Sequence, residues 1–326
     1  MLVDKFNRKH NYLRISLTDN CNLRCNYCMP EEDYDFTPAS RLMQVDEIEA
    51  IAKVFVAAGV DKIRLTGGEP LVRKDAGEII RRLSALPVFL TLTTNASRIH
   101  EFIDLLEELG VKSINVSLDT LIRDTFSILT KRDLFDQVYG NIELLLNRGF
   151  KVKINVVVMR GVNDKEIVDF VRWTSLNPIH VRFIEFMPFE GNHWKREKLV
   201  TWQEILALVS SHYTIEPLAR FPHETVKKYR VQGFMGTFAV ISTMSSPFCS
   251  DCNRLRLTAD GKMKNCLFSK GESDLLGAYR RGEDIRPLIS QTVVDKAEAL
   301  GGQFAPDLIL MDANQLVNRS MISIGG

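Results

Sequence analysis

The chain has 326 residues, of which 45% are hydrophobic and 25% charged, and its formal net charge is +1. These values are ordinary for a globular protein, and the near-zero charge excludes a global attraction to nucleic acid or to an anionic membrane. The sequence has no apolar run of about 18 residues and no signal-peptide core, so we expect a cytoplasmic protein without a membrane span.

The first two-thirds of the chain alternate between strand-like and helix-like segments. Strands rich in β-branched residues are expected at 12–18, 62–67, 88–95, 113–119, 152–159 and 180–187. Amphipathic helices are expected at 45–58, 76–86, 99–109, 135–148, 165–175 and 202–212. Six such units in a row predict a parallel sheet with helical crossovers, in the form of a doubly wound sheet or a curved, incomplete barrel.

The pattern changes after about Pro217 to short strands and turns. Strands are expected at 225–231, 236–243, 254–258 and 262–267, with helices at 275–281 and 285–299. Asp260-Gly261 between two alternating segments predicts a hairpin. We therefore expect two closely packed domains, residues 1–217 and a smaller α+β domain of residues 218–326.

Six cysteines without a secretory signal favour metal or redox chemistry over disulfides. Cys21, Cys25 and Cys28 follow the first strand with the spacing C-x3-C-x2-C. Three thiolates can hold three irons of a 4Fe–4S cluster and leave the fourth iron open to a small molecule. A zinc module is disfavoured, because no histidine lies between His10 and His100.

The other three cysteines are Cys249, Cys252 and Cys266, spaced C-x2-C-x13-C. They could form most of a zinc site or be buried free thiols. The hairpin would return Cys266 to the pair, so a second three-cysteine cluster is favoured. Arg254 and Arg256 share one face of their strand, which suits a polyanion such as a triphosphate, although an exposed charged edge strand would have the same pattern.

The first cysteine triplet with Tyr27, and the segment Thr66-Gly67-Gly68-Glu69-Pro70, resemble the signatures of the radical S-adenosylmethionine (SAM) superfamily. Over nearly its full length, the chain resembles the MoaA family of GTP 3′,8-cyclases within it. The most specific matches are FCSDCNRLRLTADGKMKNCLF at 248–268 and the terminal Ile324-Gly325-Gly326.

The resemblance implies an incomplete (βα)6 TIM-like barrel of parallel strands with a C-terminal cluster-binding domain. It implies two 4Fe–4S clusters, SAM, and a 5′-deoxyadenosyl radical that abstracts the C3′ hydrogen of GTP. The product would be (8S)-3′,8-cyclo-7,8-dihydroguanosine 5′-triphosphate, the first intermediate of molybdenum cofactor biosynthesis. Implied partners are GTP, an external one-electron reductant, cyclic pyranopterin monophosphate synthase (MoaC) as recipient of the product, and a second copy in a homodimer.

The resemblance also implies roles for individual residues. Contacts to SAM would come from Tyr27, Gly68, Ser117 and Met187. Contacts to GTP would come from Arg14, Arg64, Thr93, Lys153, Arg254, Leu255 and Arg256. The diglycine tail, Gly325 and Gly326, would support catalysis. Independently, several of these residues lie within or at the ends of predicted parallel strands, where ligands gather. Ion pairs with carboxylates such as Asp119 or Glu185 are the alternative for each cation.

One departure and two alternatives stay open. The third strand ends in Thr94-Asn95-Ala96, where Asn-Gly is expected in many relatives, which puts that loop's conformation in doubt. The chain could be a radical SAM enzyme that modifies peptides, although such enzymes usually carry more C-terminal cysteines. A non-enzymatic iron–sulfur or zinc protein is also conceivable, but it would need neither the TGGEP segment nor the arginine pair beside Cys252.

Overall fold

The computed structural model describes residues 1–29, 34–304 and 316–325. One curved sheet runs through it in the order β12-β11-β10-β1-β2-β3-β4-β5-β6-β9-β8-β7. Its central strands are the six predicted ones, and they pair in parallel: β1 (Tyr12–Ser16), β2 (Lys62–Thr66), β3 (Phe89–Thr94), β4 (Ser113–Ser117), β5 (Lys151–Val158) and β6 (His180–Glu185).

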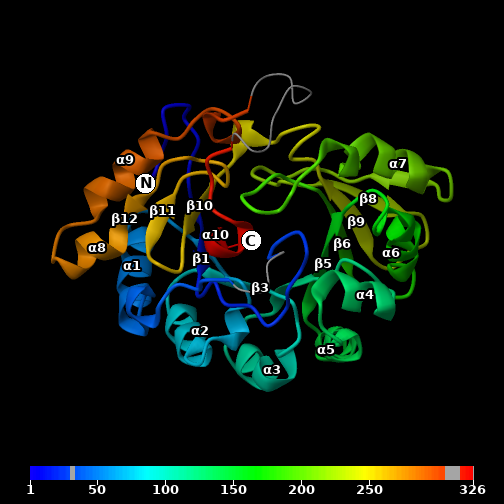
Figure 1. Ribbon diagram of the computed structural model, residues 1–326, viewed down its shortest axis with the longest axis horizontal. Coiled ribbons are helices and arrows are strands. Elements are labelled where there is room, and N and C mark those ends of the chain that lie inside the picture. The colour runs from blue at the N-terminus through cyan, green and yellow to red at the C-terminus, as the bar shows by residue number, and fades with distance from the viewer. Residues whose placement is uncertain (30–33, 305–315, 326) are drawn as a thin grey trace.

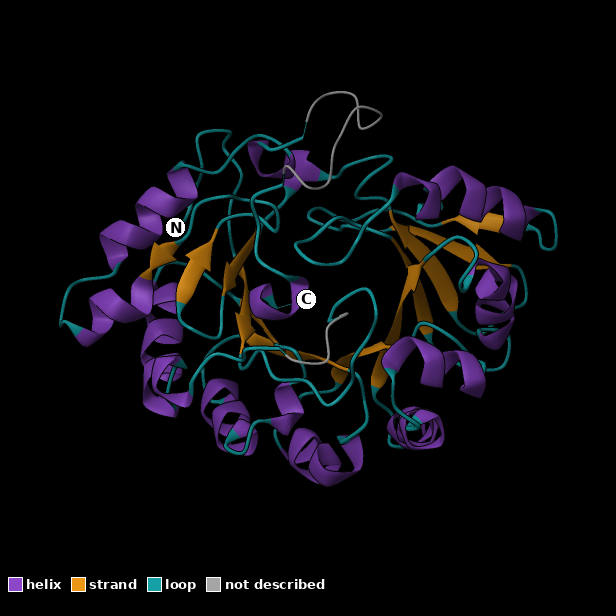
Figure 2. Ribbon diagram, viewed as in Figure 1, coloured by secondary structure: helices purple, strands orange, loops and turns teal. Residues whose placement is uncertain are grey.

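Helices cover the outer face of this sheet (Figure 2). They are α1 (Val45–Ala57), α2 (Ala76–Ser84), α3 (Ile99–Glu108), α4 (Arg123–Thr130), α5 (Phe135–Asn147), α6 (Ile167–Trp173) and α7 (Trp202–Ser210). The C-terminal part adds α8 (Leu275–Arg280), α9 (Arg286–Val294) and α10 (Met321–Ile324). Figure 1 shows α10 and the C-terminus within the curve of the sheet.

The C-terminal strands extend both edges of the same sheet. β9 (Thr237–Ile241) pairs in parallel with β6, followed by antiparallel β8 (Lys227–Val231) and β7 (Ile215–Pro217). At the other edge β10 (Arg254–Leu257) pairs in parallel with β1, followed by antiparallel β11 (Lys262–Lys264) and β12 (Ser273–Asp274). Among the described strands β7 and β12 do not pair, so the barrel is incomplete, as predicted.

Alternation along the strands separates the core from the inner face of the barrel. Leu13, Ile15 and Leu65 are almost fully buried in the hydrophobic core. Arg14 lies between them in sequence and lines an internal cavity instead. The parallel register sets Arg14 beside Arg64 of β2 and Arg256 of β10. The order of the strands thus brings arginines from distant parts of the sequence into one row.

Some boundaries differ from the sequence prediction. α4 was not predicted, because its sequence RDTFSILT is short and rich in β-branched residues, which are poor helix formers. The helix expected at 285–299 ends at Val294. Within the part of the chain that the structure describes, no helix combines the length and apolarity needed to cross a bilayer.

Candidate active site

The first three cysteines lie in the loop that follows β1. Cys21, Cys25 and Cys28 are partly buried free thiols. The carbonyl of Cys25 accepts hydrogen bonds from the N–H groups of Cys28 and Met29 at 2.9 and 2.8 Å, which turns the chain sharply. The Asn95 amide lies 3.8 Å from the Cys21 Sγ. The turn therefore carries Cys25 and Cys28, and Cys21 precedes it in the same loop.

Gly67 and Gly68 allow this loop to pack directly on the end of β2. A Cβ on Gly68 would lie 2.5 Å from the carbonyl oxygen of Asn20, and one on Gly67 would lie 2.6 Å from that of Thr18. The N–H of Gly68 donates to Thr18 O at 2.7 Å. Glycine is therefore required at both positions by close backbone approach.

The electrostatics of the first triplet show three sulfurs close to one another and short of positive charge. Burial raises the pKa of Cys21 to about 11 and that of Cys28 to about 12, and the neighbouring Cys21 sulfur adds to the latter shift. The pKa of Cys25 is also raised by burial, then by Asp119 and both other thiols. Cationic iron would supply the charge that thiolates need here, so this donor set fits an iron–sulfur cluster.

Tyr27 is held in this loop by the carboxylate of Asp119, which follows β4. Its hydroxyl donates to Asp119 Oδ2 at 2.6 Å, and the other oxygen of Asp119 accepts from the N–H of Val157 at 2.8 Å. Tyr27 and Met187 both pack against one small cluster of buried side chains that includes Phe186. Two residues predicted to contact SAM thus lie on the same side of the barrel.

The structure also brings Cys249, Cys252 and Cys266 together, because all three line one cavity of about 430 Å³. Cys252 differs from the other two. Arg254 Nη2 lies 3.6 Å and Lys296 Nζ lies 3.7 Å from its sulfur. Burial opposes ionisation, but these two cations outweigh it and lower the pKa of Cys252 to about 6.

Neither triplet has the geometry of a mononuclear metal site. Among the described residues, no three His, Cys, Asp or Glu side chains are placed to hold a single metal ion. A tetrahedral zinc site requires its ligands to converge on one ion. In a cubane cluster each thiolate binds a different iron, so the three sulfurs stand further apart. The described residues therefore give no support to a mononuclear zinc site at either triplet.

The 430 Å³ cavity lies inside the barrel and is strongly basic. Seven cationic side chains line it: Arg14, Lys62, Arg64, Lys153, Arg182, Arg254 and Arg256. Among its described lining residues, the one carboxylate is that of Glu224, which already pairs with Lys228 at 2.9 Å. Four buried polar atoms of the described wall have no hydrogen-bond partner: Arg182 Nε, Asn115 Oδ1, Asn155 Oδ1 and Asn253 Oδ1. Such a wall is complementary to a polyanion with additional polar groups.

The shifted pKa values of the titratable groups in this cavity show that its positive charges repel one another. Burial, followed by the charges of Arg182 and Arg64, lowers the pKa of Lys153 to about 7. Burial and Arg64 likewise lower the pKa of Arg182 to about 10. For Tyr12, burial is outweighed by Arg64, Arg14 and Lys62, which lower its pKa to about 7. Each shift has the sign expected where positive charge lacks a counter-ion.

The C-terminal tail enters this basic region. A guanidinium nitrogen of Arg256 donates to the carbonyl oxygen of Gly325. Gly325 has a φ of +83°, and a Cβ there would lie 2.6 Å from Thr66 Oγ1 and 2.9 Å from Ser16 Cβ. Glycine is thus required at 325 both by its backbone conformation and by its close contacts. Gly326 lies outside the described residues.

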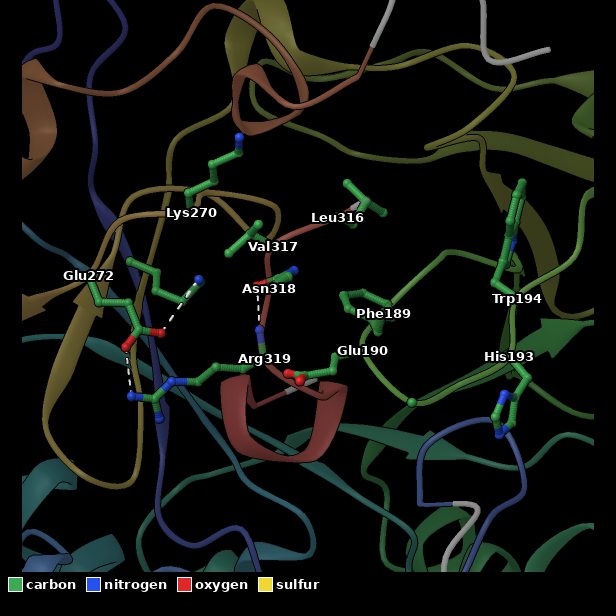
Figure 3. A pocket seen from close by; sticks show the side chains of 12 residues that line it. Phe189, Glu190, His193, Trp194, Lys270, Glu272, Leu316, Val317, Asn318 and Arg319 are labelled. Atoms are coloured by element: carbon green, nitrogen blue, oxygen red, sulfur yellow. Dashed lines mark hydrogen bonds and ion pairs between the residues drawn. The ribbon is translucent and has the colours of Figure 1, made fainter. Parts of the chain in front are cut away.

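A larger cavity, of about 770 Å³, lies beside the tail (Figure 3). Its walls are the loop from Phe189 to Trp194 and the tail residues 316–319, with Lys264, Lys270 and Glu272. It contains none of the six cysteines and has both acidic and basic walls. We therefore place the chemistry in the smaller, basic cavity.

Most of the residues predicted to contact GTP line the basic cavity, but two do not. Thr93 lies behind it and accepts a hydrogen bond from Arg64 Nη1 at 3.3 Å. The Leu255 side chain is fully buried in the hydrophobic core, so its backbone alone could reach a ligand. Met187 lines the cavity, and Ser117 ends β4. The role predicted for each of these residues remains a prediction.

The sequence analysis missed several residues of the cavity wall. They are Tyr12, Lys62, Asn115, Asn155 and Arg182. A signal was present, because each is a polar residue that alternates with apolar ones along a predicted strand. Lys296 and Asp119 were missed or given no specific role, since only the fold shows that they contact Cys252 and Tyr27.

Comparisons with known proteins agree with this geometry. The family model of the radical SAM superfamily matches residues 15–174, and the model "Molybdenum Cofactor Synthesis C" matches residues 179–301. The mitochondrial GTP 3′,8-cyclase of Arabidopsis thaliana is 46% identical over 100% of this chain and 84% of its own length. The chain belongs to the GTP 3′,8-cyclase family of radical SAM proteins.

Other relatives extend the comparison. The GTP 3′,8-cyclase of Rhodopirellula baltica is 40% identical over 100% of this chain and 92% of its own length. Molybdenum cofactor biosynthesis protein 1 of Mus musculus is 43% identical over 99% of this chain, which spans only 51% of that longer protein. The crystal structure of Streptococcus suis SuiB bound to S-adenosylmethionine has a TM-score of 0.60 at 17% identity, and covers 95% of this chain and 72% of SuiB. That last likeness concerns the fold.

Membership of the radical SAM superfamily implies one 4Fe–4S cluster and SAM as cofactors. Cys21, Cys25 and Cys28 fit the cluster by number, spacing and mutual closeness, as described above. The doubtful loop at Ala96 is explained as well. Ala96 takes a φ of +62°, the left-handed conformation that glycine would adopt without strain. Its N–H donates to Thr94 Oγ1 at 3.0 Å and its carbonyl accepts from Asn141 at 2.7 Å, which holds the strained backbone in place.

Proposed function

We propose that this protein is a GTP 3′,8-cyclase, which converts GTP into (8S)-3′,8-cyclo-7,8-dihydroguanosine 5′-triphosphate. The observation that carries the proposal is the basic cavity, which seven cationic side chains and three cysteines line together. A triphosphate would satisfy the cations, and the cysteine end would face the base. The sequence identity of 46% to a protein named GTP 3′,8-cyclase supports the same substrate.

The protein's own residues would bind and orient the reactants. Arg14, Arg64 and Arg256 stand in one row across three strands and would hold the triphosphate with charge-assisted hydrogen bonds. Tyr27, fixed by Asp119, would lie beside SAM. When bound, the first cluster and SAM supply the 5′-deoxyadenosyl radical that removes the C3′ hydrogen of GTP. The barrel wall would exclude water and oxygen while C3′ bonds to C8.

We further propose that Cys249, Cys252 and Cys266 hold a second 4Fe–4S cluster whose open iron orients the purine. Lys296 and Arg254 at Cys252 support an anionic ligand set there, because both cations lie within 3.7 Å of one sulfur. The external reductant would supply one electron for the cleavage of SAM and a second electron that, with a proton from solvent, converts the cyclised radical into the product. We also propose that the chain divides into domains of residues 1–217 and 218–326. The protein would be cytoplasmic, form a homodimer and pass its product to cyclic pyranopterin monophosphate synthase.

Anaerobic reconstitution tests the function directly. We expect about eight irons per chain from two cubanes, consumption of SAM that depends on GTP, and a cyclised product isomeric with GTP. Cys25→Ala should abolish SAM cleavage. Iron binding with SAM cleavage that does not respond to GTP would indicate another radical SAM reaction, such as peptide modification. Protein that never cleaves SAM would refute the enzyme assignment.

A further inference from the structure

The C-terminal tail is fastened to the rest of the protein by an ion network around Arg319 (Figure 3). Its guanidinium forms a bidentate pair with Asp260, at 2.9 and 3.0 Å. A second bond of Arg319 Nη2 reaches Glu272 Oε2 at 2.6 Å. Glu272 also lies 3.5 Å from the Nζ of Lys264. Arg319, Lys264, Asp260 and Glu272 thus form one continuous network, and Lys262 Nζ joins it at 4.0 Å from Asp260 Oδ2.

This network is mostly buried. The side chain of Lys264 is 1% exposed, those of Glu272 and Asp260 are 15% and 19% exposed, and that of Arg319 is 25% exposed. Hydrogen bonds from Arg319 and Thr258, together with the charge of Arg319, outweigh burial and lower the pKa of Asp260. Isolated surface pairs contribute little to stability, but bidentate and networked pairs of low exposure contribute more. The network is therefore able to hold the tail.

The network lies directly upstream of the segment that reaches the cavity. Ser320 follows Arg319, and its hydroxyl lies 2.8 Å from the Tyr34 hydroxyl. The single turn of α10 (Met321–Ile324) is the whole connection from Ser320 to Gly325, whose carbonyl oxygen meets Arg256. Because this connection is a single turn, the anchoring of Arg319 contributes to placing Gly325 against Arg256. The burial of Ile322 and Ile324 and the hydrogen bond from Asn318 Nδ2 to Leu267 O at 3.0 Å contribute as well.

The partners of Arg319 come from the hairpin that carries the second cysteine triplet. Asp260 lies in the turn between β10 and β11, and Glu272 directly precedes β12. Arg256 is in β10 and Cys266 follows β11. The β10–β11 hairpin and the segment after it therefore carry the partners of Arg319 together with Arg256 and Cys266.

We propose that Arg319 is a positioning residue, which locks the C-terminal tail onto the β10–β11 hairpin so that Gly325 sits against Arg256. The part of this inference that concerns turnover rests on the proposed GTP cyclisation. The part that concerns the tail does not. Arg319 touches neither substrate nor cofactor and acts through the tail.

Hydrogen–deuterium exchange of the reconstituted protein tests the lock itself. Arg319→Gln should speed exchange in residues 318–325, because loss of the network lowers the ratio of anchored to free tail by roughly 5- to 30-fold. Arg281→Gln is the matched control, since Arg281 forms one exposed ion pair with Glu283 at 2.6 Å. It should leave tail exchange unchanged. Equal tail exchange in Arg319→Gln and wild type would overturn the proposal, whatever the protein catalyses.

Two further measurements separate positioning from general stability. Asp260→Asn should release the tail less than Arg319→Gln does, because Arg319 keeps its bond to Glu272. The double variant should be no worse than Arg319→Gln alone, because Arg319→Gln already removes the contact with Asp260. At unchanged iron content, Arg319→Gln should lower kcat for cyclisation about 5- to 30-fold, with partial rescue in Arg319→Lys. If kcat falls only in step with lost iron or lost fold, Arg319 has a merely structural role. If wild type itself does not cyclise GTP, the proposed function fails and the exchange result stands alone.

Discussion

Arg182 gives the sharpest test of the basic cavity, because removing its charge should stabilise the protein and weaken ligand binding at once. It lies on β6, beside Asn155 of β5 in the sheet register, and lines the cavity. Its Nε is buried without a hydrogen-bond partner. Burial and the charges of neighbouring Arg64 and Arg14 disfavour the guanidinium ion in the ligand-free protein. We predict that Arg182→Gln raises stability without GTP and lowers the affinity for GTP.

The size of the effect follows from the pKa of Arg182, which falls from 12.5 to about 10. At about 1.4 kcal/mol per unit, the cost of charging Arg182 in the folded state is at most on the order of 3 kcal/mol. Because the folded-state pKa of this base is depressed, the cost is fully present at neutral pH and fades only as the pH rises through about 10. Screening and lost packing reduce the gain for Gln to about 1 kcal/mol, a rise of about 1–2 °C in Tm for a chain of this length. A lost charge-assisted hydrogen bond to phosphate costs about 1.5–3 kcal/mol, or roughly a 10- to 100-fold higher Kd for GTP.

Thermal unfolding with and without GTP, and anaerobic calorimetry for the Kd, measure both effects. Arg230→Gln is the matched control, because Arg230 is an exposed residue of the nearby strand β8. It should change neither quantity. The reasoning is refuted if Arg182→Gln destabilises the ligand-free protein at unchanged iron content, or if its Kd for GTP equals that of wild type.

Three further predictions address other parts of the site. Affinity for GTP should fall as the pH rises above about 7, because Lys153 of the ligand-free protein loses its proton there. GTP binding in that pH range should take up protons. Lys153→Arg should remove the Lys153 contribution to both effects. Gly325→Ala should lower cyclase activity at unchanged iron content, because it adds a left-handed strain of about 1–2 kcal/mol to the clash with Thr66. Adding Thr66→Ala should restore part of the rate. Equal activity in Gly325→Ala and wild type would exclude the close contact. Cys266→Ala should lose about half of the iron and stop cyclisation while sparing some uncoupled SAM cleavage; full cyclase activity would refute the second cluster.

The sequence predicted the barrel strands well, because parallel buried strands carry a strong signal. Each of the six predicted strands forms, with ends shifted by a few residues at most. The pairing of β10 with β1 could not be predicted, since the two strands lie far apart in the sequence and pairing partners leave no local signal. That pairing is what sets Arg256 beside Arg14. The sequence therefore predicted the individual arginines as candidate ligand contacts, but not that they form one row.

The residues that the sequence analysis missed act through tertiary contacts. Arg319 looks like any charged residue near a chain end, and its role depends on Asp260 and Glu272 from a distant hairpin. Lys296 follows α9 with no motif of its own, yet its ammonium group lies against the Cys252 sulfur. Neither contact leaves a periodic pattern. Contacts of this kind require coordinates, whereas cysteine spacing and strand alternation do not.

Several residues in and around the basic cavity lower the stability of the protein, through strained backbone or through unpaired positive charge. Their clustering in one place supports the assignment of the site. Ala96 takes a left-handed backbone at the end of β3, and Gly325 takes one beside β1 and β2. Lys153 and Arg182 face other cations across the barrel instead of carboxylates. A sequence under selection for stability alone would replace such residues, so their joint presence requires a compensating interaction. A bound polyanion would compensate the charges, and the hydrogen bonds around Ala96 hold its strained backbone in place without a ligand.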